Sequence, residues 1–278
     1  MRIGFLKMQG LGNDFFVFDA PPAAARGRLG PDTLRALADR RTGVGFDQAL
    51  MLEPPRDPGS RAFYRIFNAD GSEVEQCGNG ARCIAALLYA RAPALGRELT
   101  MGSPGGAVHA RVREDGTVSV DMGEPNFDPR SLPMLAAAEA DVYRLTVDGT
   151  AVEFGAVSMG NPHIVLDVAD VADAPVARLG PLLERHAWFP KRTNVGFMQI
   201  VDRGHIRLRV FERGVGETQA CGTGACGAVA VGRRHGLLDA AVRVDLPGGT
   251  ASVSWEGPGR TLWLTGPATT VFEGSVDV

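Results

Sequence analysis

Two segments of this chain repeat one another, and the repeat constrains the fold more than any other feature. "RIFNADGSEVEQCGNGA" begins at Arg65 and "RVFERGVGETQACGTGA" begins at Arg209. They share Arg, Phe, Glu, Cys, Gly, Gly and Ala at seven of seventeen places. Shorter repeats keep the same order in both halves: "GN" at 12–13 and 160–161, "LGP" at 29–31 and 179–181, and "VGF" at 44–46 and 195–197. Two copies predict a pseudo-dimer within one chain, not a solenoid.

The length agrees with two halves. At 278 residues the chain exceeds the prior of about 150 residues for a single domain. The turn-rich segment "DMGEPNFDPR", which contains two prolines, marks the expected boundary. We expect an N-terminal half at residues 1–122, which the C-terminal segment 266–278 could join, and a C-terminal half at 123–265.

Composition excludes several classes of protein. Hydrophobic residues make up 45%, charged residues 22%, and the formal net charge is −3, as in ordinary globular proteins and without the basic excess of a nucleic-acid-binding protein. The N-terminus shows no signal-peptide pattern, and no run of about eighteen apolar residues follows. We therefore expect no membrane partner and a cytoplasmic location. Four cysteines are too few for a secreted disulfide scaffold, so reduced thiols are expected.

The elements outside the repeated segments are mainly hairpins. "VHARVREDGTVSVDM", "YRLTVDGTAVEF" and "MQIVDRGHIRLRVFE" alternate on either side of short turns, which predicts antiparallel pairing. Each half also carries one surface helix, "PDTLRALADRR" in the first and "PLLERHAWF" in the second. A further helix follows each Cys-Gly loop. "ARCIAALLYA" and "GACGAVAV" are apolar on nearly all sides, so both should be buried.

These patterns together predict a fold class. We expect an α+β (mixed α/β) protein with two pseudo-symmetric halves, each a mostly antiparallel sheet rolled around a central buried helix.

The two Cys-Gly loops are the candidate site. Cys77 and Cys221 each lie just before a helix, where unpaired N–H groups and the helix dipole lower a thiol pKa from about 8.5. The glycines in "CGNG" and "CGTG" let backbone donors approach an anion closely. If both loops face one cleft between the halves, a carbon held there has a thiol on each side. One thiol could then remove a proton and the other could return one.

Simpler interpretations of the cysteines were weighed. Cys83 and Cys226 lie inside the apolar helices and are best explained as small buried hydrophobes. The spacings of Cys77 to Cys83 and of Cys221 to Cys226 do not match the usual zinc knuckle, so no metal is expected. A redox pair remains possible, although it would not need the anion-binding loop to be duplicated.

The segment after Cys221 also matches the glycine spacing of a dinucleotide-binding motif. Gly222, Gly224 and Gly227 have the fingerprint spacing, and Asp245 lies near the distance expected of a ribose-binding acid. That motif needs a strand leading directly into the first glycine. Here the strand "IRLRVF" ends at Phe211, ten residues before Cys221. The NAD-binding interpretation is therefore disfavoured.

Seven motifs carry a resemblance to a known family. "GLGNDF", "TGVGFDQ", "FNADGSEVEQCGNGARC", "GNPH", "TNVGF", "FERGVGET" and "ACGTGAC" occur in this order over nearly the whole chain. Together they resemble diaminopimelate epimerase, an enzyme of lysine and peptidoglycan-precursor synthesis. The resemblance implies cofactor-independent interconversion of LL- and meso-diaminopimelate by Cys77 and Cys221.

The same resemblance assigns further residues. It implies that Gly78-Asn79 and Gly222-Thr223 bind the carboxylate at the reacting centre, and that His163 and Glu212 assist the thiols. It implies contacts with the rest of the substrate from Asn13, Gln48, Asn68, Asn161, Asn194, Glu212 and Arg213. Single asparagines are common in turns; of these, Asn13 and Asn161 are also repeated between the halves.

The resemblance further implies a homodimer. Phe272 in "TGPATTVFEG" stands where the family often has Tyr at the dimer contact, so the polar details of that contact differ. Two other functions were considered: a related cofactor-independent amino-acid racemase such as a proline-type racemase, and a redox-active thiol protein. The polar set around Glu212 and Arg213 argues for a substrate with a second charged end.

Overall fold

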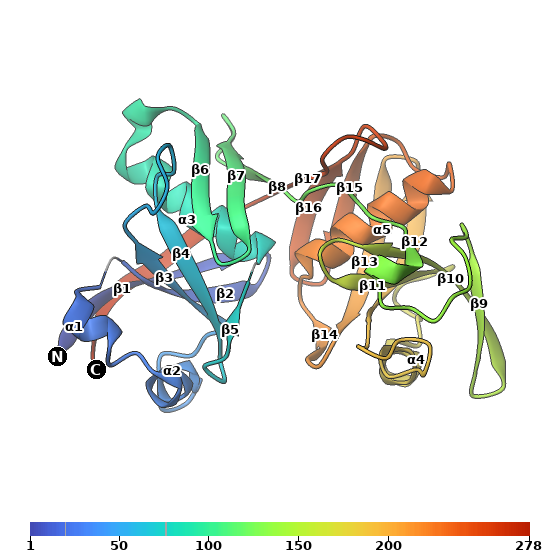
Figure 1. Cartoon of the computed structure of the whole chain (residues 1–278), viewed down its shortest axis with the longest axis horizontal. Helices are drawn as coiled ribbons and strands as arrows, with labels where there is room; N and C mark the ends of the chain where they lie inside the picture. The colour runs from blue at the N-terminus through green and yellow to red at the C-terminus, as the bar shows by residue number, and fades with distance from the viewer. Residues whose placement is uncertain (20, 76) are drawn as a thin grey trace. The chain divides into compact units, whose positions relative to one another are not determined.

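The computed structural model describes residues 1–19, 21–75 and 77–278 (Figure 1). The chain divides into two compact units. The first contains Met1–Val120 together with Gly266–Val278, and the second contains Asp121–Thr265. No helix in the described part of the chain is both long and apolar enough to cross a membrane.

The strands of the first unit pair in an order that begins with the end of the chain. That order is β18 (Thr269–Asp277), β1 (Arg2–Gly10), β2 (Asn13–Phe18), β3 (Gln48–Glu53), β4 (Phe63–Asn68), β6 (Glu98–Ser103), β7 (Gly106–Val112) and β8 (Val118–Asp121), with β5 (Glu73–Val74) also on β4. The β2–β3 and β4–β6 pairs are parallel, and the others are antiparallel.

The second unit repeats this pairing. Its order is β9 (Tyr143–Val147), β10 (Thr150–Ser158), β11 (Pro162–Asp167), β12 (Asn194–Asp202), β13 (His205–Glu212), β15 (Ala241–Leu246), β16 (Gly249–Ser254) and β17 (Trp263–Gly266), with β14 (Gly216–Thr218) also on β13. Its parallel pairs, β11–β12 and β13–β15, fall at the same places in the order. The expected mixed α/β class and the mostly antiparallel, repeated halves are confirmed.

An ion pair that occurs once in each unit explains part of the repeated segments. Arg65 on β4 pairs with Glu73 on β5 at 2.7 Å, and Arg209 on β13 pairs with Glu217 on β14 at 2.6 Å. Each pair joins the two strands of the hairpin that leads into a Cys-Gly loop. The repeated Arg and Glu therefore brace the approach to the cysteine in both units.

The helix after each cysteine is buried, as its composition predicts. α3 (Gly78–Arg91) contacts β1 and β7, which lie far apart in the strand order, so the first sheet curves around it. α5 (Gly222–Arg234) contacts β10, β11, β12, β13 and β16 in the second unit (Figure 1). Small residues permit this close approach: a Cβ on Gly155 of β10 would lie 2.3 Å from Val231 of α5.

The surface helices differ from the expected ones in their limits. α2 (Pro31–Ala38) ends three residues before the end of the expected helix at 31–41. α4 (Val176–Glu184) begins and ends five residues before the expected helix at 181–189. Pro181, expected to start α4, lies inside the helix. Burial of Val176, Leu179 and Leu183 in the core of the second unit outweighs the hydrogen bond that proline cannot donate. The short helices are α1 (Ala23–Arg26), η1 (Pro93–Leu95) and η2 (Pro129–Ser131).

Two of the shorter repeats are not structurally equivalent, contrary to expectation. "LGP" leads into the start of α2 in the first unit but lies within α4 in the second. "VGF" precedes β3 in the first unit but lies inside β12 in the second. Three-residue matches of common residue types arise without shared structure, whereas Asn13 and Asn161 do occupy equivalent positions before the parallel strand pairs.

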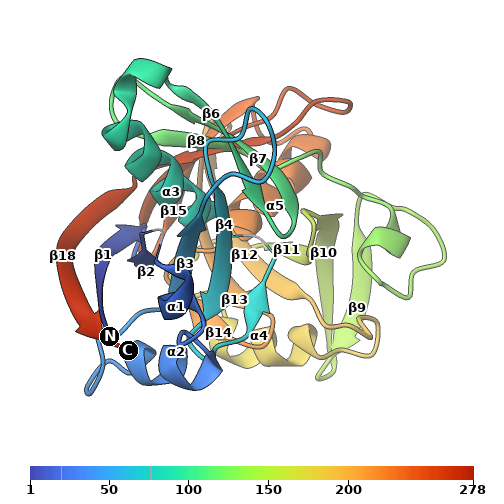
Figure 2. The same cartoon turned by 60° about the vertical axis from the view of Figure 1, so that its left-hand side comes forward.

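The C-terminal strand completes the first unit. β18 runs antiparallel to β1, and the ammonium of Met1 donates to the carbonyl of Val278 at 2.7 Å (Figure 2). Val271 and Phe272 on β18 are exposed, at 57% and 46%. The Phe272 ring also packs edge-on against Phe5, with ring centroids 5.9 Å apart.

Candidate active site

Each Cys-Gly loop places its cysteine at the start of the buried helix of its unit. Cys77 is the residue before the first turn of α3, and Cys221 is the residue before the first turn of α5, both with extended backbone. Gly78 and Gly222 are the first helical residues. Amides of a first helical turn have no partner inside the helix, so each thiol lies beside backbone donors suited to an anion.

Cys221 contacts a carboxylate. Its thiol is only 4% exposed and donates to Oε2 of Glu212, at the end of β13, over 3.0 Å. The other Glu212 oxygen accepts from the hydroxyl of Thr218 on β14. The antiparallel β13–β14 hairpin therefore orients the carboxylate toward the sulfur. A carboxylate in this position can take up the thiol proton or return it.

Burial raises the pKa of the Cys221 thiol well above its ordinary value, and the negative charge and hydrogen bond of Glu212 raise it further. Hydrogen bonds with the Thr223 hydroxyl and the Gly224 backbone amide lower the pKa, but by less. The expectation that the helix start leaves this thiol with a lowered pKa is therefore wrong for Cys221. The helix donors are present, and desolvation outweighs them.

His163 on β11 is linked to the Cys221 thiol through Asn161 and Thr223. It is 1% exposed, and its Nε2 is 3.0 Å from Oδ1 of Asn161. Asn161 in turn donates through Nδ2 to the Thr223 hydroxyl at 3.3 Å, and that hydroxyl is 3.7 Å from the Cys221 sulfur. The direction of the His163–Asn161 hydrogen bond depends on the ring tautomer. Burial, followed by the positive charge of Arg213, lowers the His163 pKa to about 3, so the ring is neutral.

Asn194 and Arg213 form a separate pair in the second unit. Asn194 at the start of β12 is 3% exposed, donates to the Pro162 carbonyl at 2.8 Å and accepts from the Arg213 amide at 2.9 Å. It therefore fixes the turn after β13. The Arg213 side chain is exposed, with Nη1 3.3 Å from the Lys191 carbonyl. Its guanidinium keeps further donors for an anionic group.

The first unit has an equivalent contact around its own cysteine. Asn79 donates through Nδ2 to Oδ1 of Asn13 at 3.3 Å, the same distance as between Asn161 and Thr223. The Cys77 sulfur is 3.9 Å from the same Asn13 oxygen, and Cys77 is half-buried. Asn13 and Asn161 thus contact the residue two places after the cysteine in their respective units.

Gln48 and Asn68 form the remaining pair of the first unit. Gln48 opens β3, Asn68 ends β4, and Gln48 donates through Nε2 to the Asn68 oxygen at 3.0 Å. The buried Gln48 Oε1 has no hydrogen-bond partner among the described residues. A buried acceptor without a partner is costly, and a substrate ammonium group would satisfy it. Asn68 also occupies the position in its repeat that Glu212 has in the other, so only Cys221 has a carboxylate there.

Two buried cysteines are distinct from this site. Cys83 in α3 and Cys226 in α5 are 0% exposed, which confirms the prediction that they are core residues. Burial raises the pKa of the Cys83 thiol to about 12, so it stays protonated. None of the four cysteines forms a disulfide with another described residue.

Sequence reasoning missed two residues near the first cysteine. Arg82 on α3 is 0% exposed and donates through Nη2 to the Asn79 oxygen at 2.9 Å. Asp47 accepts from Asn13 at 2.9 Å. A charged residue in an otherwise apolar helix is a signal that could have identified Arg82. Asp47 directly precedes Gln48 in a quoted motif, but no pattern distinguished it from a turn residue.

Comparisons with known proteins identify the family and the fold of the chain. A family model described as diaminopimelate epimerase matches residues 5–128 and 155–271. The chain is 55% identical over 280 residues to a diaminopimelate epimerase of Thioalkalivibrio sulfidiphilus, with 100% of each chain covered. It is 51% identical over 276 residues to a diaminopimelate epimerase of Stutzerimonas stutzeri, with 99% of each covered. A crystal structure of a phenazine biosynthesis protein of the PhzF family from Bacillus anthracis has a TM-score of 0.69 at 17% identity, covering 100% of both chains, and shares the fold.

Proposed function

Because the chain belongs to the diaminopimelate epimerase family, we propose that it interconverts LL- and meso-2,6-diaminopimelate with Cys77 and Cys221 as the two acid–base groups. The chain is an isomerase of that family. The observation that carries the two-thiol mechanism is the repeat itself: each unit begins its buried helix with a cysteine followed by glycine. A reaction that needs a proton acid and a proton base at one carbon has use for two such thiols.

In the proposed reaction, the thiolate of one cysteine removes the substrate α-proton and the thiol of the other donates a proton to the opposite face of that carbon. The two cysteines exchange protonation states in each turnover. The α-proton is weakly acidic, so the developing negative charge needs donors that are already oriented. The first-turn amides of α3 and α5, with Asn79 and Thr223, are suited to hold the carboxylate at the reacting centre.

Glu212 is the group that we assign to Cys221 ionisation. It lies 3.0 Å from the sulfur, within reach for direct proton transfer. The hydrogen bonds from Thr223 and the Gly224 amide then support the thiolate. We assign neutral His163 a positioning role, because it orients Asn161 and, through it, the Thr223 hydroxyl.

We assign the distal end of the substrate to polar side chains. Gln48 offers an acceptor that has no partner among the described residues and is suited to an ammonium group, and exposed Arg213 offers a guanidinium suited to a carboxylate. Asn13, Asn68, Asn161, Asn194 and Glu212 are proposed as further substrate contacts. A proline-type racemase has no use for a second charged end, so this set favours diaminopimelate.

Two further proposals concern the state of the enzyme. We propose that it forms a homodimer through the exposed outer side of β18, where Phe272 replaces a more polar aromatic residue. We also propose a cytoplasmic location, where all four thiols would remain reduced. Light scattering of the reduced protein would test the first, since a monomer at micromolar concentration contradicts it.

Isotope exchange tests the proposed function directly. The reduced protein is incubated with LL-diaminopimelate in heavy water, and meso product and α-deuterium are followed by chiral chromatography and mass spectrometry. L-proline serves as the matched alternative substrate. Deuterated meso-diaminopimelate without exchange into proline is expected. Exchange into proline alone would assign a racemase, and exchange into neither would leave a thiol protein of another kind.

A further inference from the structure

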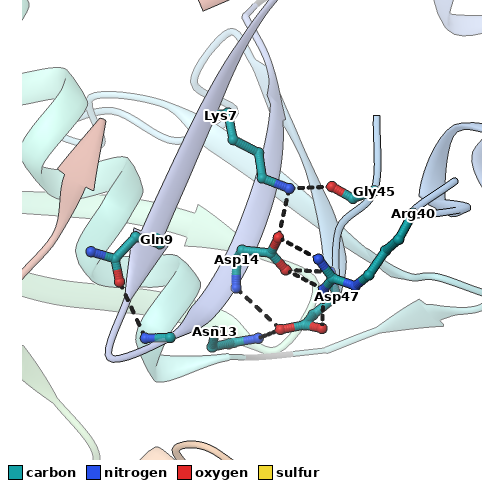
Figure 3. Close-up of polar contacts among 8 residues, drawn as sticks. Lys7, Gln9, Asn13, Asp14, Arg40, Gly45 and Asp47 are labelled. Carbon is teal, nitrogen blue, oxygen red and sulfur yellow. Dashed lines mark hydrogen bonds and ion pairs between the residues drawn. The ribbon is translucent and has the colours of Figure 1, made fainter. Parts of the chain in front are cut away.

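A network of charged and amide groups surrounds the start of two parallel strands in the first unit (Figure 3). Asn13 opens β2, and Asp47 immediately precedes β3, which runs parallel to β2. The beginnings of parallel neighbours lie at the same edge of a sheet. Asp47 Oδ2 there accepts from the Asn13 side-chain amide at 2.9 Å and from the backbone amide of Asp14 at 3.1 Å.

Asp47 is itself held by charge. Its other oxygen accepts from Arg40 at 2.8 Å, and its backbone amide donates to the Asp14 carboxylate at 2.9 Å. Asp14 pairs with Arg40 at 2.7 Å and with buried Lys7 at 2.6 Å. Burial alone would raise the Asp14 pKa, but Arg40 and Lys7 lower it to about 2, so Asp14 stays charged. The Asp47 carboxylate therefore has a fixed place.

Asp47, Asn13, Asn79 and Arg82 form a chain of hydrogen bonds. The carboxylate at one end and the guanidinium at the other fix the donor and acceptor at each step. A carboxylate only accepts, so Asn13 must present its –NH2 group to Asp47. A guanidinium only donates, so Asn79 must present its oxygen to Arg82, 2.9 Å away. The remaining ends of the two amides, Asn79 Nδ2 and Asn13 Oδ1, then face one another at 3.3 Å. Each amide has one orientation that satisfies both neighbours.

The orientation matters because Cys77 lies beside the Asn13 oxygen. The sulfur is 3.9 Å from Oδ1, so the thiol hydrogen has an acceptor there. With the amide reversed, an –NH2 group would point at the sulfur and would favour the thiolate instead. Asp47 therefore influences whether an acceptor or a donor of Asn13 faces the Cys77 sulfur, although Asp47 has no contact with the thiol among the interactions described.

We propose that Asp47 is a positioning residue, which holds the Asn13 amide so that its oxygen faces Cys77 and the substrate. The proposal rests on the proposed function, in which Asn13 contacts the substrate and Cys77 exchanges a proton with it. Asp47 acts only through Asn13. It follows that removing Asp47 should matter only while the Asn13 side chain is present.

A double-mutant cycle tests this dependence. Asp47→Ala should lower kcat/KM for LL-diaminopimelate by about tenfold or more, since misplacing a substrate contact has effects of this size. In an Asn13→Ala background the same change should lower it by less than about twofold. Asp47→Asn, which keeps an oxygen for Asn13, should lose less than Asp47→Ala. Equal losses from Asp47→Ala in both backgrounds would overturn the proposal.

Asp39→Ala is the matched control. Asp39 lies in the same segment between α2 and β3, and its carboxylate accepts from the Arg41 and Thr42 amides at 2.8 and 2.7 Å. The substitution removes a loop-stabilising carboxylate that makes no hydrogen bond to Asn13 among the interactions described, so kcat/KM should stay within about twofold of wild type. A loss as large as that of Asp47→Ala would assign the effect to loop stability and overturn the proposal.

A spectroscopic readout separates failure of this proposal from failure of the proposed function. The chain has six asparagines, so selective ¹⁵N labelling gives few side-chain amide signals, and Asn13→Ala identifies the pair from Asn13. That pair should shift and exchange faster with water in Asp47→Ala and stay unchanged in Asp39→Ala. An unchanged Asn13 pair in Asp47→Ala refutes the positioning role, whatever substrate the wild type turns over.

Discussion

Replacing Gly224 with alanine should impair catalysis more than stability. Gly224 lies buried in the first turn of α5, and an added Cβ would be 2.9 Å from Val210 Cγ2 and 3.2 Å from the Cys221 sulfur. Ordinary contacts begin at 3.4 Å, so Val210 would have to yield by 0.5 Å (3.4 − 2.9) and the sulfur by 0.2 Å (3.4 − 3.2). Val210 is 1% exposed and has little room to move. Much of the displacement should therefore fall on Cys221.

The expected sizes of the two effects differ. Overpacking a core costs about 1–3 kcal/mol, and alanine recovers about 1 kcal/mol over glycine in a helix, so the free energy of unfolding should fall by about 0–2 kcal/mol. A thiol moved from its place against Glu212 should lower kcat about tenfold to a hundredfold. Chemical denaturation and initial rates with LL-diaminopimelate measure the two quantities.

Gly232→Ala provides the matched comparison in the same helix. Its Cβ would lie 2.4 Å from Leu238 Cδ1, a larger overlap at a position away from the thiol. It should destabilise the fold at least as much as Gly224→Ala while leaving kcat within about twofold of wild type. If Gly224→Ala keeps wild-type kcat, or Gly232→Ala loses as much, the argument that steric pressure on the sulfur limits turnover is wrong.

Three further predictions follow from the site. Cys77→Ala and Cys221→Ala should each abolish deuterium exchange and epimerisation, whereas Cys83→Ala and Cys226→Ala should mainly lower the free energy of unfolding; exchange retained in either of the first pair contradicts the two-thiol assignment. Arg213→Lys should sharply lower kcat/KM for LL-diaminopimelate with unchanged thermal unfolding, because a lysine side chain cannot form two parallel hydrogen bonds to a carboxylate. Free lysine, which lacks the distal carboxylate, should be a very poor substrate of the wild type. Since the folded-state pKa of His163 is lowered to about 3, the unfolded state takes up a proton first on acidification, and stability is lost as pH falls below about 6.5. Wild type should lose about 2 kcal/mol more than His163→Gln between pH 7 and pH 5, and equal losses in urea titrations would show that His163 is not kept neutral by folding.

The sequence predicted the parts of this structure that depend on local pattern. Alternating residues around Asp148-Gly149 predicted the β9–β10 hairpin, and both turn residues have the positive φ that such a turn requires, at 51° and 73°. The all-apolar segments after Cys77 and Cys221 predicted the buried helices. These features are set by neighbours along the chain, so they are visible without the fold.

Features that depend on distant neighbours were not predictable in this way. Pro181 looked like a helix start because the packing of Val176 before it cannot be seen in the sequence. The raised pKa of Cys221 follows from complete burial beside Glu212, which helix-start chemistry alone does not reveal. Asp47 could not be identified from the sequence, because its role depends on the start of β2 lying beside the start of β3.

The pairing of β18 with β1 has a consequence for synthesis of the chain. Residues Asp121–Thr265 form one continuous unit, whereas the first unit joins Met1–Val120 with Gly266–Val278, a segment that is made only after the whole second unit. The first unit begins to emerge earlier but lacks β18 until the segment after Thr265 has followed, which leaves one edge of β1 open to other chains in the meantime. The half that is made first is therefore finished last.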